Sequence, residues 1–325
     1  MKRRYILSGA AALTGGLIWK LFPNLGSSNA AQQASSKLDN SPQKTSGTNT
    51  SQNLAQTYFL PPLIARPQRN DAPKLRFAML ADTGMGDANQ YAVAAALQKT
   101  YDRQDFPLVL LGGDNIYPTG EINRIIEVFE KPYRYLLEKN VTFRAVLGNH
   151  DIISDNGLAQ LAYEQFRMNG RFYQFSYGDI DFFGLDTNVN ANWREQFPWL
   201  KESLAKSKAS CKIAFGHHPF YSSGAHGGNA DFVKFLAPLF NQYGVQIYFC
   251  GHDHNYERFT PIGGTTYIVN GGGGAGLRPV GRSEQTVASA SRHGFCLVEV
   301  YNDQILLEAI GTDAEVFDRA VIPLL

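Results

Sequence analysis

Five short polar clusters in this sequence each follow directly on a run of apolar residues. They bring together Asp, Asn, His and Tyr, whose side chains are ligands for hard or borderline cations. The clusters are Asp82-Thr83-Gly84, Gly113-Asp114-Asn115-Ile116-Tyr117, Gly148-Asn149-His150-Asp151, Gly216-His217-His218-Pro219 and Gly251-His252-Asp253-His254. None of them contains cysteine, so the chemistry favours Fe, Mn, Zn or Mg over a structural zinc–thiolate site.

The number of candidate ligands in these clusters indicates more than one ion. Seven ligands are too many for a single cation, but they suit two cations that share a bridging carboxylate. Two ions so placed bind both the attacking and the leaving oxygen in phosphoryl transfer. Any one of these histidines alone would more often be a core or surface residue, so the prediction depends on their joint occurrence.

The elements that must position these clusters alternate between short apolar runs and helical patterns, which predicts an α/β layered fold. Predicted strands are Leu75–Ala81, Pro107–Leu111, Phe143–Leu147, Phe172–Tyr177, Ile180–Leu185, Cys211–Phe215, Val245–Cys250, Thr265–Val269, Phe295–Val300 and Ile305–Ala309. Predicted helices are 89–101, 121–138, 157–168, 193–206 and 229–241. Pro238 should kink the last of these. Sites in such folds gather beyond the carboxyl ends of strands, so the five clusters should converge.

The ordered pattern Asp…Gly-Asp-x-x-Tyr…Gly-Asn-His-Asp…Gly-His-x-Pro…Gly-His-x-His resembles the purple acid phosphatases of the calcineurin-like metallophosphoesterase superfamily. The resemblance covers 74–325 and is nearest to the small, tartrate-resistant type. Asn255-Tyr256-Glu257-Arg258, by contrast, resembles the larger plant-type members. The resemblance implies a layered β-sandwich flanked by helices, the αββα fold of metallophosphoesterases.

One departure from the wider superfamily concerns the first metal. Most relatives begin with Asp-x-His, whose His is a ligand, whereas this chain has Gly84 there and Tyr117 three residues after Asp114. A phenol with a pKa of about 10 becomes a ligand at acid pH only beside a strongly polarising cation, and ferric iron is one.

The resemblance implies the role of each ligand. Asp82, Tyr117 and His254 would bind the ferric ion, and Asp114 would bridge. Asn149, His217 and His252 would bind a second, divalent ion, which could be Fe, Zn or Mn. With one hydroxide, the centre keeps a charge of roughly +1, which suits an anionic phosphate.

The implied reaction is hydrolysis of a phosphate monoester, with a water oxygen activated by the metals attacking phosphorus in line. His150 and His226 have no metal role in the family pattern, and either could hold the phosphate or protonate the leaving oxygen. The family often has an acidic residue before the second of these histidines, but here it is Ala225.

Several other polar residues have less specific interpretations. His218 could exchange roles with its neighbour His217, although the family pattern favours His217. Structural or supporting roles are expected for Asp151 and Asp186-Thr187-Asn188. His293 is expected in a loop, where its position before a strand could place it near the rim of the site. Gly271–Gly274 could be a phosphate cradle, but without the Lys-Ser/Thr of a P-loop a tight turn near the site is favoured. Tyr221, Ser222 and Asn270 could line the substrate cleft.

Charge and composition divide the chain into three parts. Residues 1–70 carry eight Lys or Arg and one Asp, a net +7, whereas residues 71–325 carry 22 against 28 acidic residues, a net −6. The acidic part is a poor candidate for binding a nucleic acid backbone. Cys211, Cys250 and Cys296 lie in apolar runs and are expected to be buried strand cysteines.

The first part is predicted to direct export. Residues 1–31 have basic residues, an apolar run and small residues in the order of an export signal, and Arg3-Arg4 resembles a twin-arginine motif. The apolar run is shorter than the roughly 20 residues that span a bilayer, so no stable span is expected. Ordinary secretion and an uncleaved anchor remain open. Residues 32–71 are predicted to be a disordered tether, and 72–325 the catalytic domain.

The leading hypothesis is an exported, extracytoplasmic acid phosphatase acting on small phosphate esters. A phosphodiesterase or nucleotidase on the same two metals is the alternative within enzymes. A binding protein without activity, and an iron pair with redox side reactions, are hypotheses of other classes. The oligomeric state, the substrate and the second metal stay open.

Overall fold

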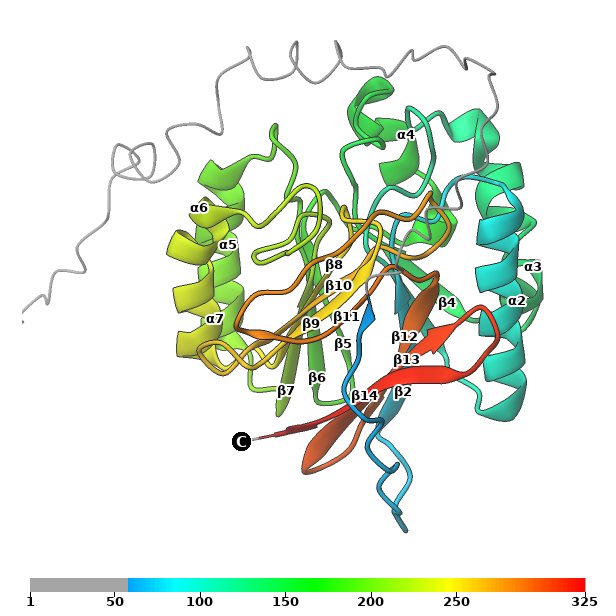
Figure 1. Cartoon of the computed structure of the whole chain (residues 1–325). Coiled ribbons are helices and arrows are strands. Elements are labelled where there is room, and N and C mark those ends of the chain that lie inside the picture. Colours follow the sequence, from blue (N-terminus) through cyan, green and yellow to red (C-terminus); the bar gives the residue numbers. More distant parts are fainter. Residues whose placement is uncertain (1–57, 325) are drawn as a thin grey trace, which may run out of the picture.

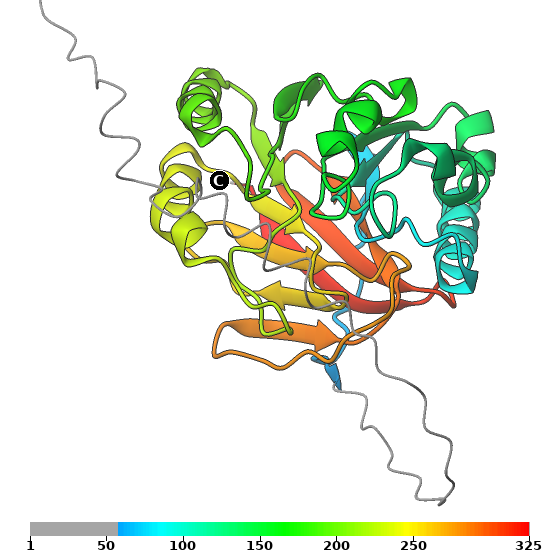
Figure 2. The ribbon, with the colours of Figure 1, turned by 90° about the horizontal axis from the view of Figure 1, so that it is seen from above.

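The computed structural model describes residues 58–324, and the predictions for residues 1–57 lie outside this range. Two β-sheets pack face to face, with helices on both outer sides (Figure 1). Seen from above, the strands of both sheets lie between the two groups of helices (Figure 2). This is the α/β sandwich flanked by helices that the sequence predicts.

The six-stranded sheet has the order β14-β13-β12-β2-β3-β4. Its strands are β2 (Leu75–Leu80), β3 (Leu108–Leu111), β4 (Thr142–Ala145), β12 (Gly294–Val300), β13 (Gln304–Gly311) and β14 (Val316–Pro323). β2, β3 and β4 are parallel, and β12 to β14 extend the sheet in antiparallel fashion. The carboxyl ends of the three parallel strands therefore lie at the same edge.

The eight-stranded sheet has the order β1-β11-β9-β10-β8-β7-β6-β5. Its strands are β1 (Tyr58–Phe59), β5 (Tyr173–Tyr177), β6 (Ile180–Gly184), β7 (Cys211–Phe215), β8 (Ile247–Cys250), β9 (Tyr256–Phe259), β10 (Thr266–Asn270) and β11 (Thr286–Ala290). β6, β7, β8 and β10 are parallel. Across the core, the ring of Phe77 in β2 packs edge-on against Phe182 and Phe249, with centroid distances of 5.4 and 6.3 Å.

The helices form two groups. The α-helices are α2 (Ala88–Arg103), α3 (Arg134–Glu138), α4 (Leu158–Leu161), α5 (Trp193–Lys206), α6 (Ala230–Phe235) and α7 (Ala237–Tyr243). Residues 58–324 also contain four single turns, η2 (Ile122–Arg124), η3 (Ile126–Glu130), η4 (Asp155–Gly157) and η5 (Glu164–Phe166). Helices α5, α6 and α7 flank one side of the sandwich and α2 and α3 the other (Figure 1).

No helix within residues 58–324 has the length and apolar character needed to cross a membrane.

Two predicted helices differ from the structure. The segment 121–138 is not one helix but a series of short turns that ends in α3. Pro132 lies at its break, where proline offers no backbone N–H to the preceding turn. The segment 157–168 contains only α4 and η5, and Gly157 before them is left-handed, with φ 73°. The predicted helix 229–241 divides at Leu236, two residues before Pro238, as expected.

The predicted tether ends at residue 71, but contacts with the catalytic domain begin earlier, at residue 58. Tyr58–Phe59 pairs with β11, and the Arg66 guanidinium reaches Glu299 at 2.6 Å and Glu308 at 2.8 Å. Both glutamate side chains are almost fully buried, so they require cationic partners, and Arg66 supplies one. The ordered part of the chain therefore includes 58–71.

Candidate metal centre

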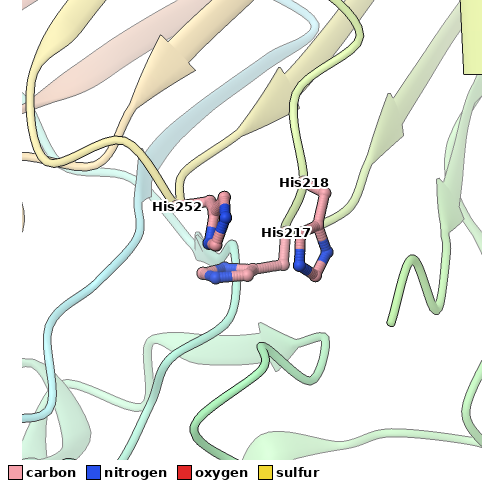
Figure 3. Close-up of side chains that lie close together, drawn as sticks. All are labelled: His217, His218 and His252. Atoms are coloured by element: carbon pink, nitrogen blue, oxygen red, sulfur yellow. The ribbon is translucent and has the colours of Figure 1, made fainter. Parts of the chain in front are cut away.

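The five polar clusters come together at one end of the sandwich. Three of them follow β2, β3 and β4 of the six-stranded sheet, and two follow β7 and β8 of the eight-stranded sheet. Because parallel strands of both sheets end at this edge, residues far apart in the sequence meet there. Figure 3 shows His217 and His252 with their rings together, each on the loop that follows its strand.

A first group of side chains surrounds the hydroxyl of Tyr117. This oxygen lies 3.0 Å from Asp82 Oδ1, 2.9 Å from Asp114 Oδ2 and 3.1 Å from His254 Nε2. All four side chains are buried, with Asp82 fully so. Two carboxylates, a phenol and an imidazole thus direct their polar atoms at one point.

A second group lies on the other side of Asp114. His217 Nε2 is 3.4 Å from Asp114 Oδ2 and 3.0 Å from Asn149 Oδ1. The ring of His252 stands 5.1 Å from that of His217, measured between centroids. Asp114 Oδ2 therefore faces both groups, the position that a bridging ligand requires.

The two carboxylates are held so that one oxygen of each is directed at the cluster. Asp82 Oδ2 accepts the backbone N–H of His252 at 2.9 Å, and Asp114 Oδ1 accepts that of His150 at 2.9 Å. Their other oxygens contact Tyr117. Asp82 and Asp114 both have left-handed backbones, with φ 58° and 53°, which is uncommon for residues with a Cβ and concentrates at functional sites.

Two glycines allow the loops to approach this closely. A Cβ on Gly251 would lie 2.1 Å from Asp82 Oδ2, and one on Gly148 would lie 2.1 Å from Asp114 Oδ1. Gly84, at the position where most superfamily relatives have His, is equally confined, since a Cβ there would lie 2.1 Å from the carbonyl oxygen of Asn115. The backbone at Gly84 therefore leaves no room for a histidine, and Tyr117 supplies a polar atom instead.

Hydrogen bonds to backbone carbonyls fix the ring orientation of two of the histidines. His217 donates its Nδ1–H to the carbonyl of Gly112 at 3.0 Å, and His254 donates its Nδ1–H to that of Gly276 at 2.8 Å. Each ring then presents the Nε2 lone pair to the cluster. This arrangement is typical of metal-binding histidines.

In the metal-free protein, the shifted pKa values of these side chains also indicate a cation-binding site. Burial lowers the pKa of His217, but the Asp114 carboxylate outweighs this and raises it to about 9. Burial raises the pKa of Asp114, but His217 outweighs it and the pKa falls below its usual range. A proton on His217 thus balances the charge of the buried Asp114 carboxylate where a metal would otherwise do so.

Burial and the charges of Asp82 and Asp114 raise the pKa of Tyr117 well above that of a free phenol, so the phenolate requires a cation in place of the proton.

Comparison with known proteins identifies the family. Residues 75–256, more than half of the chain, match the family model described as calcineurin-like phosphoesterase. The chain belongs to the calcineurin-like phosphoesterase family.

Relatives within this phosphoesterase family confirm the resemblance to purple acid phosphatases. The chain is similar to human tartrate-resistant acid phosphatase type 5, with 27% identity over 318 residues, 83% of this chain and 96% of that protein. It is similar to the same protein of rabbit (Oryctolagus cuniculus), with 30% identity over 62% of this chain and 73% of that protein. A purple acid phosphatase from yellow lupin (Lupinus luteus) seeds has the same fold, with a TM-score of 0.67, 21% identity, and coverage of 77% of this chain and 53% of that one.

The second histidine of the His217-His218 pair has a different environment in this phosphoesterase. Thr187 Oγ1 accepts the backbone N–H groups of both residues at 3.1 and 3.0 Å, so its own hydrogen is free for His218 Nδ1 at 3.0 Å. The remaining proton of His218 is then on Nε2. Burial and the neighbouring His217 lower the pKa of His218 to about 3. His218 lies beside His252, with 4.5 Å between ring centroids (Figure 3), but these contacts favour His217 as the ligand.

The two histidines predicted to act on the substrate lie around the metal-ligand cluster. His150 packs its ring on Tyr117, with centroids 4.6 Å apart, and donates Nδ1–H to Pro118 at 2.6 Å. His226 stacks on His252 at 4.2 Å, and its backbone N–H donates to Asp253 at 2.9 Å. Asp253, buried between the two histidines of its cluster, therefore anchors the loop that carries His226.

Other residues considered from the sequence have structural roles. Asp151 is buried and accepts the backbone N–H groups of Asn115, Ile116 and Gly148, which joins two of the polar clusters. Asp186 pairs with Arg171 at 2.6 Å.

Three residues predicted to line a substrate cleft have the following surroundings. Asn270 is buried and donates to the carbonyl of Met79 at 2.6 Å. Tyr221 and Ser222 line a separate cavity of about 420 Å³ beside α6. Sequence reasoning missed Arg278, which contacts His226, because it lies in a loop without any ligand-type cluster to mark it.

Proposed function

We propose that this chain is an exported acid phosphatase that hydrolyses phosphate monoesters at a dinuclear centre of one ferric and one divalent ion. The observation that carries the proposal is the Tyr117 hydroxyl, which lies within 3.1 Å of Asp82, Asp114 and His254. The enzyme class, a metal-dependent phosphomonoesterase of the acid phosphatase type, is confirmed by the family and its relatives. The iron, the second metal and export are part of the proposal.

The ligand sets follow from the two groups around Asp114. Tyr117, Asp82 and His254 would hold the ferric ion, and Asp114 would bridge. The divalent ion, Fe, Zn or Mn, would be held by Asn149, His217 and His252. Imidazole and amide oxygen are suitable ligands for any of these three. When bound, the two ions would polarise the phosphate and activate the attacking water.

The side chains beside the ligands would act on the substrate. Because His150 uses Nδ1–H for a carbonyl, its Nε2 is left for the substrate, and when protonated it would donate to a phosphate oxygen. His226, whose ring stacks on that of His252, would meet the leaving group. One histidine would then hold the phosphate while the other protonates the leaving oxygen.

The test combines metal content, colour and turnover of the purified protein. We expect about one iron and one further metal per chain, a visible band, and phenyl phosphate hydrolysis that a chelator abolishes. A colourless, active enzyme without iron would leave the phosphomonoesterase standing and refute the ferric centre. A metal-loaded protein that hydrolyses no phosphomonoester would refute the activity.

A further inference from the structure

A half-buried arginine, Arg278, lies at the rim of the candidate metal centre, on the loop between β10 and β11. Its Nη1 group contacts Nε2 of His226 and donates to the carbonyl of His252 at 3.4 Å. Within residues 58–324, no carboxylate forms an ion pair with it. Both contacts use Nη1 alone, so the edge formed by Nε and Nη2 has no partner among the described residues. That edge is the one that binds carboxylate or phosphate through two hydrogen bonds.

The position of Arg278 is fixed by the ligand loop. Its backbone N–H donates to the carbonyl of His254 at 3.0 Å, and the carbonyl of Gly276 accepts Nδ1–H of His254 at 2.8 Å. Further along, Gly281 donates its N–H to the carbonyl of Ser223 at 3.0 Å. The arginine loop is thus joined on one side to a candidate iron ligand and on the other to the loop of His226.

Arg278 places a positive charge against the ring of His226. The residue before His226 is the exposed Ala225, which adds no charge of its own. The side of the centre where the leaving group would lie therefore carries an additional fixed positive charge.

We propose that Arg278 is a specificity-determining residue that binds a second anionic group on the leaving group of the substrate. The substrate class is then phosphate monoesters whose alcohol carries a carboxylate or a further phosphate. This deepens, and rests on, the proposed phosphatase function. In the reaction the bond between phosphorus and the leaving oxygen breaks, water supplies the new oxygen on phosphorus, and the leaving oxygen gains a proton. Arg278 exchanges no proton, and its contact with the substrate is confined to the second anion.

The test compares two substrates that differ by one remote charge. Phenyl phosphate and 3-carboxyphenyl phosphate have similar leaving groups, but the second carries an additional carboxylate. Both are assayed with the metal-loaded wild-type protein and with Arg278→Gln and Arg278→Lys. The control is Arg282→Gln, which removes a charge from the same loop where the guanidinium is exposed and packs over the ring of Phe59 at 4.7 Å.

We expect the wild-type protein to prefer the carboxylated substrate. Arg278→Gln should reduce this preference in kcat/KM by about tenfold, because a charged hydrogen bond to the second anion is lost. Arg278→Lys should restore part of the preference, and Arg282→Gln should retain it. Equal changes for both substrates in Arg278→Gln, or no preference in the wild type, would overturn the proposal.

A binding measurement separates this proposal from the phosphatase function itself. Phenylphosphonate and 3-carboxyphenylphosphonate are not hydrolysed, and calorimetry gives their affinities without turnover. Tighter binding of the carboxylated compound, lost in Arg278→Gln, supports the anion site even if no ester is hydrolysed. Equal affinities in the wild type would refute it, whereas absent turnover with selective binding would refute only the phosphatase.

Discussion

At the scale of single residues, the two groups of candidate ligands are joined through a shared carboxylate. Asp114 Oδ2 faces both Tyr117 and His217, so one carboxylate oxygen belongs to both groups of candidate ligands. Asp82 directs Oδ1 at Tyr117 and His254, at 3.0 and 3.4 Å, and uses Oδ2 to accept the backbone N–H of His252. Substitution of one residue should therefore affect one metal or both, depending on which oxygen is removed.

Asp114→Asn should lose both metals. An amide keeps the size of the carboxylate but removes the charge that a bridging ligand must supply, so we expect turnover of phenyl phosphate to fall by at least about 100-fold. Elemental analysis of the purified variant tests the metal content directly. Retention of both ions with near-normal turnover would show that the ligand assignment is wrong.

Tyr117→Phe should bleach the protein. A phenolate bound to ferric iron transfers charge to the metal and gives a violet to pink colour, which neither a zinc pair nor a manganese pair produces. The ring still packs between His150 and His254 after the oxygen is removed, so the fold should survive. Activity should fall only in part, and the iron should become easier to reduce because an anionic ligand is gone. An unchanged visible spectrum would exclude Tyr117 as the source of colour.

At the scale of elements, an apolar run followed by a polar cluster identified the strands that carry the site. β9 and β14 escaped prediction because charged residues are buried within them. Arg258 of β9 forms a two-point ion pair with Asp318 of β14, at 2.7 and 2.9 Å, and both are buried. Each charge interrupts its strand's apolar pattern, and only the neighbouring sheet supplies its partner.

Arg66→Ala tests whether the segment before residue 72 belongs to the folded domain. The substitution removes one cationic partner from Glu299 and one from Glu308, which keep Arg76 and Arg319 respectively. We expect the free energy of unfolding to fall by about 1–2 kcal/mol, measured by urea denaturation. Lys206→Ala is the control, because Lys206 and its partner Glu202 are 74% and 65% exposed and such pairs contribute little. Equal stability of wild type and Arg66→Ala would mean that this segment adds nothing to the fold.

At the scale of the whole molecule, the sandwich joins two sheets whose parallel strands end at one edge. Neither sheet alone holds a complete ligand set, since the six-stranded sheet positions Asp82, Asp114 and Asn149, and the eight-stranded sheet positions His217 and His252. Metal binding should therefore couple the packing of the two sheets to the site. The proposed export signal, residues 1–31, lies outside the described residues.

Replacement of Arg3 and Arg4 by lysine tests the route of export. If the twin-arginine route is used, the variant should remain inside the cell while its phosphatase activity in lysates is unchanged, because the pair lies far from the catalytic domain in sequence. Fractionation with an activity assay measures this. Normal export of the variant would refute the route but not the extracytoplasmic location.

The sequence by itself determined the family and the fold class and predicted the types of ligand, because five polar clusters at strand ends are local patterns that survive without knowledge of contacts. It could not determine that Gly84 leaves no room for a histidine, since the obstacle is the carbonyl of Asn115 on another strand's loop. Nor could it identify Arg278, because the proposed role of this residue depends on its contact with His226, 52 residues away in the sequence. The boundary before residue 72 was also decided by distant partners, Glu299 and Glu308. In each case the physical reason is the same: sterics and charge act across space, and tertiary structure alone brings those groups together.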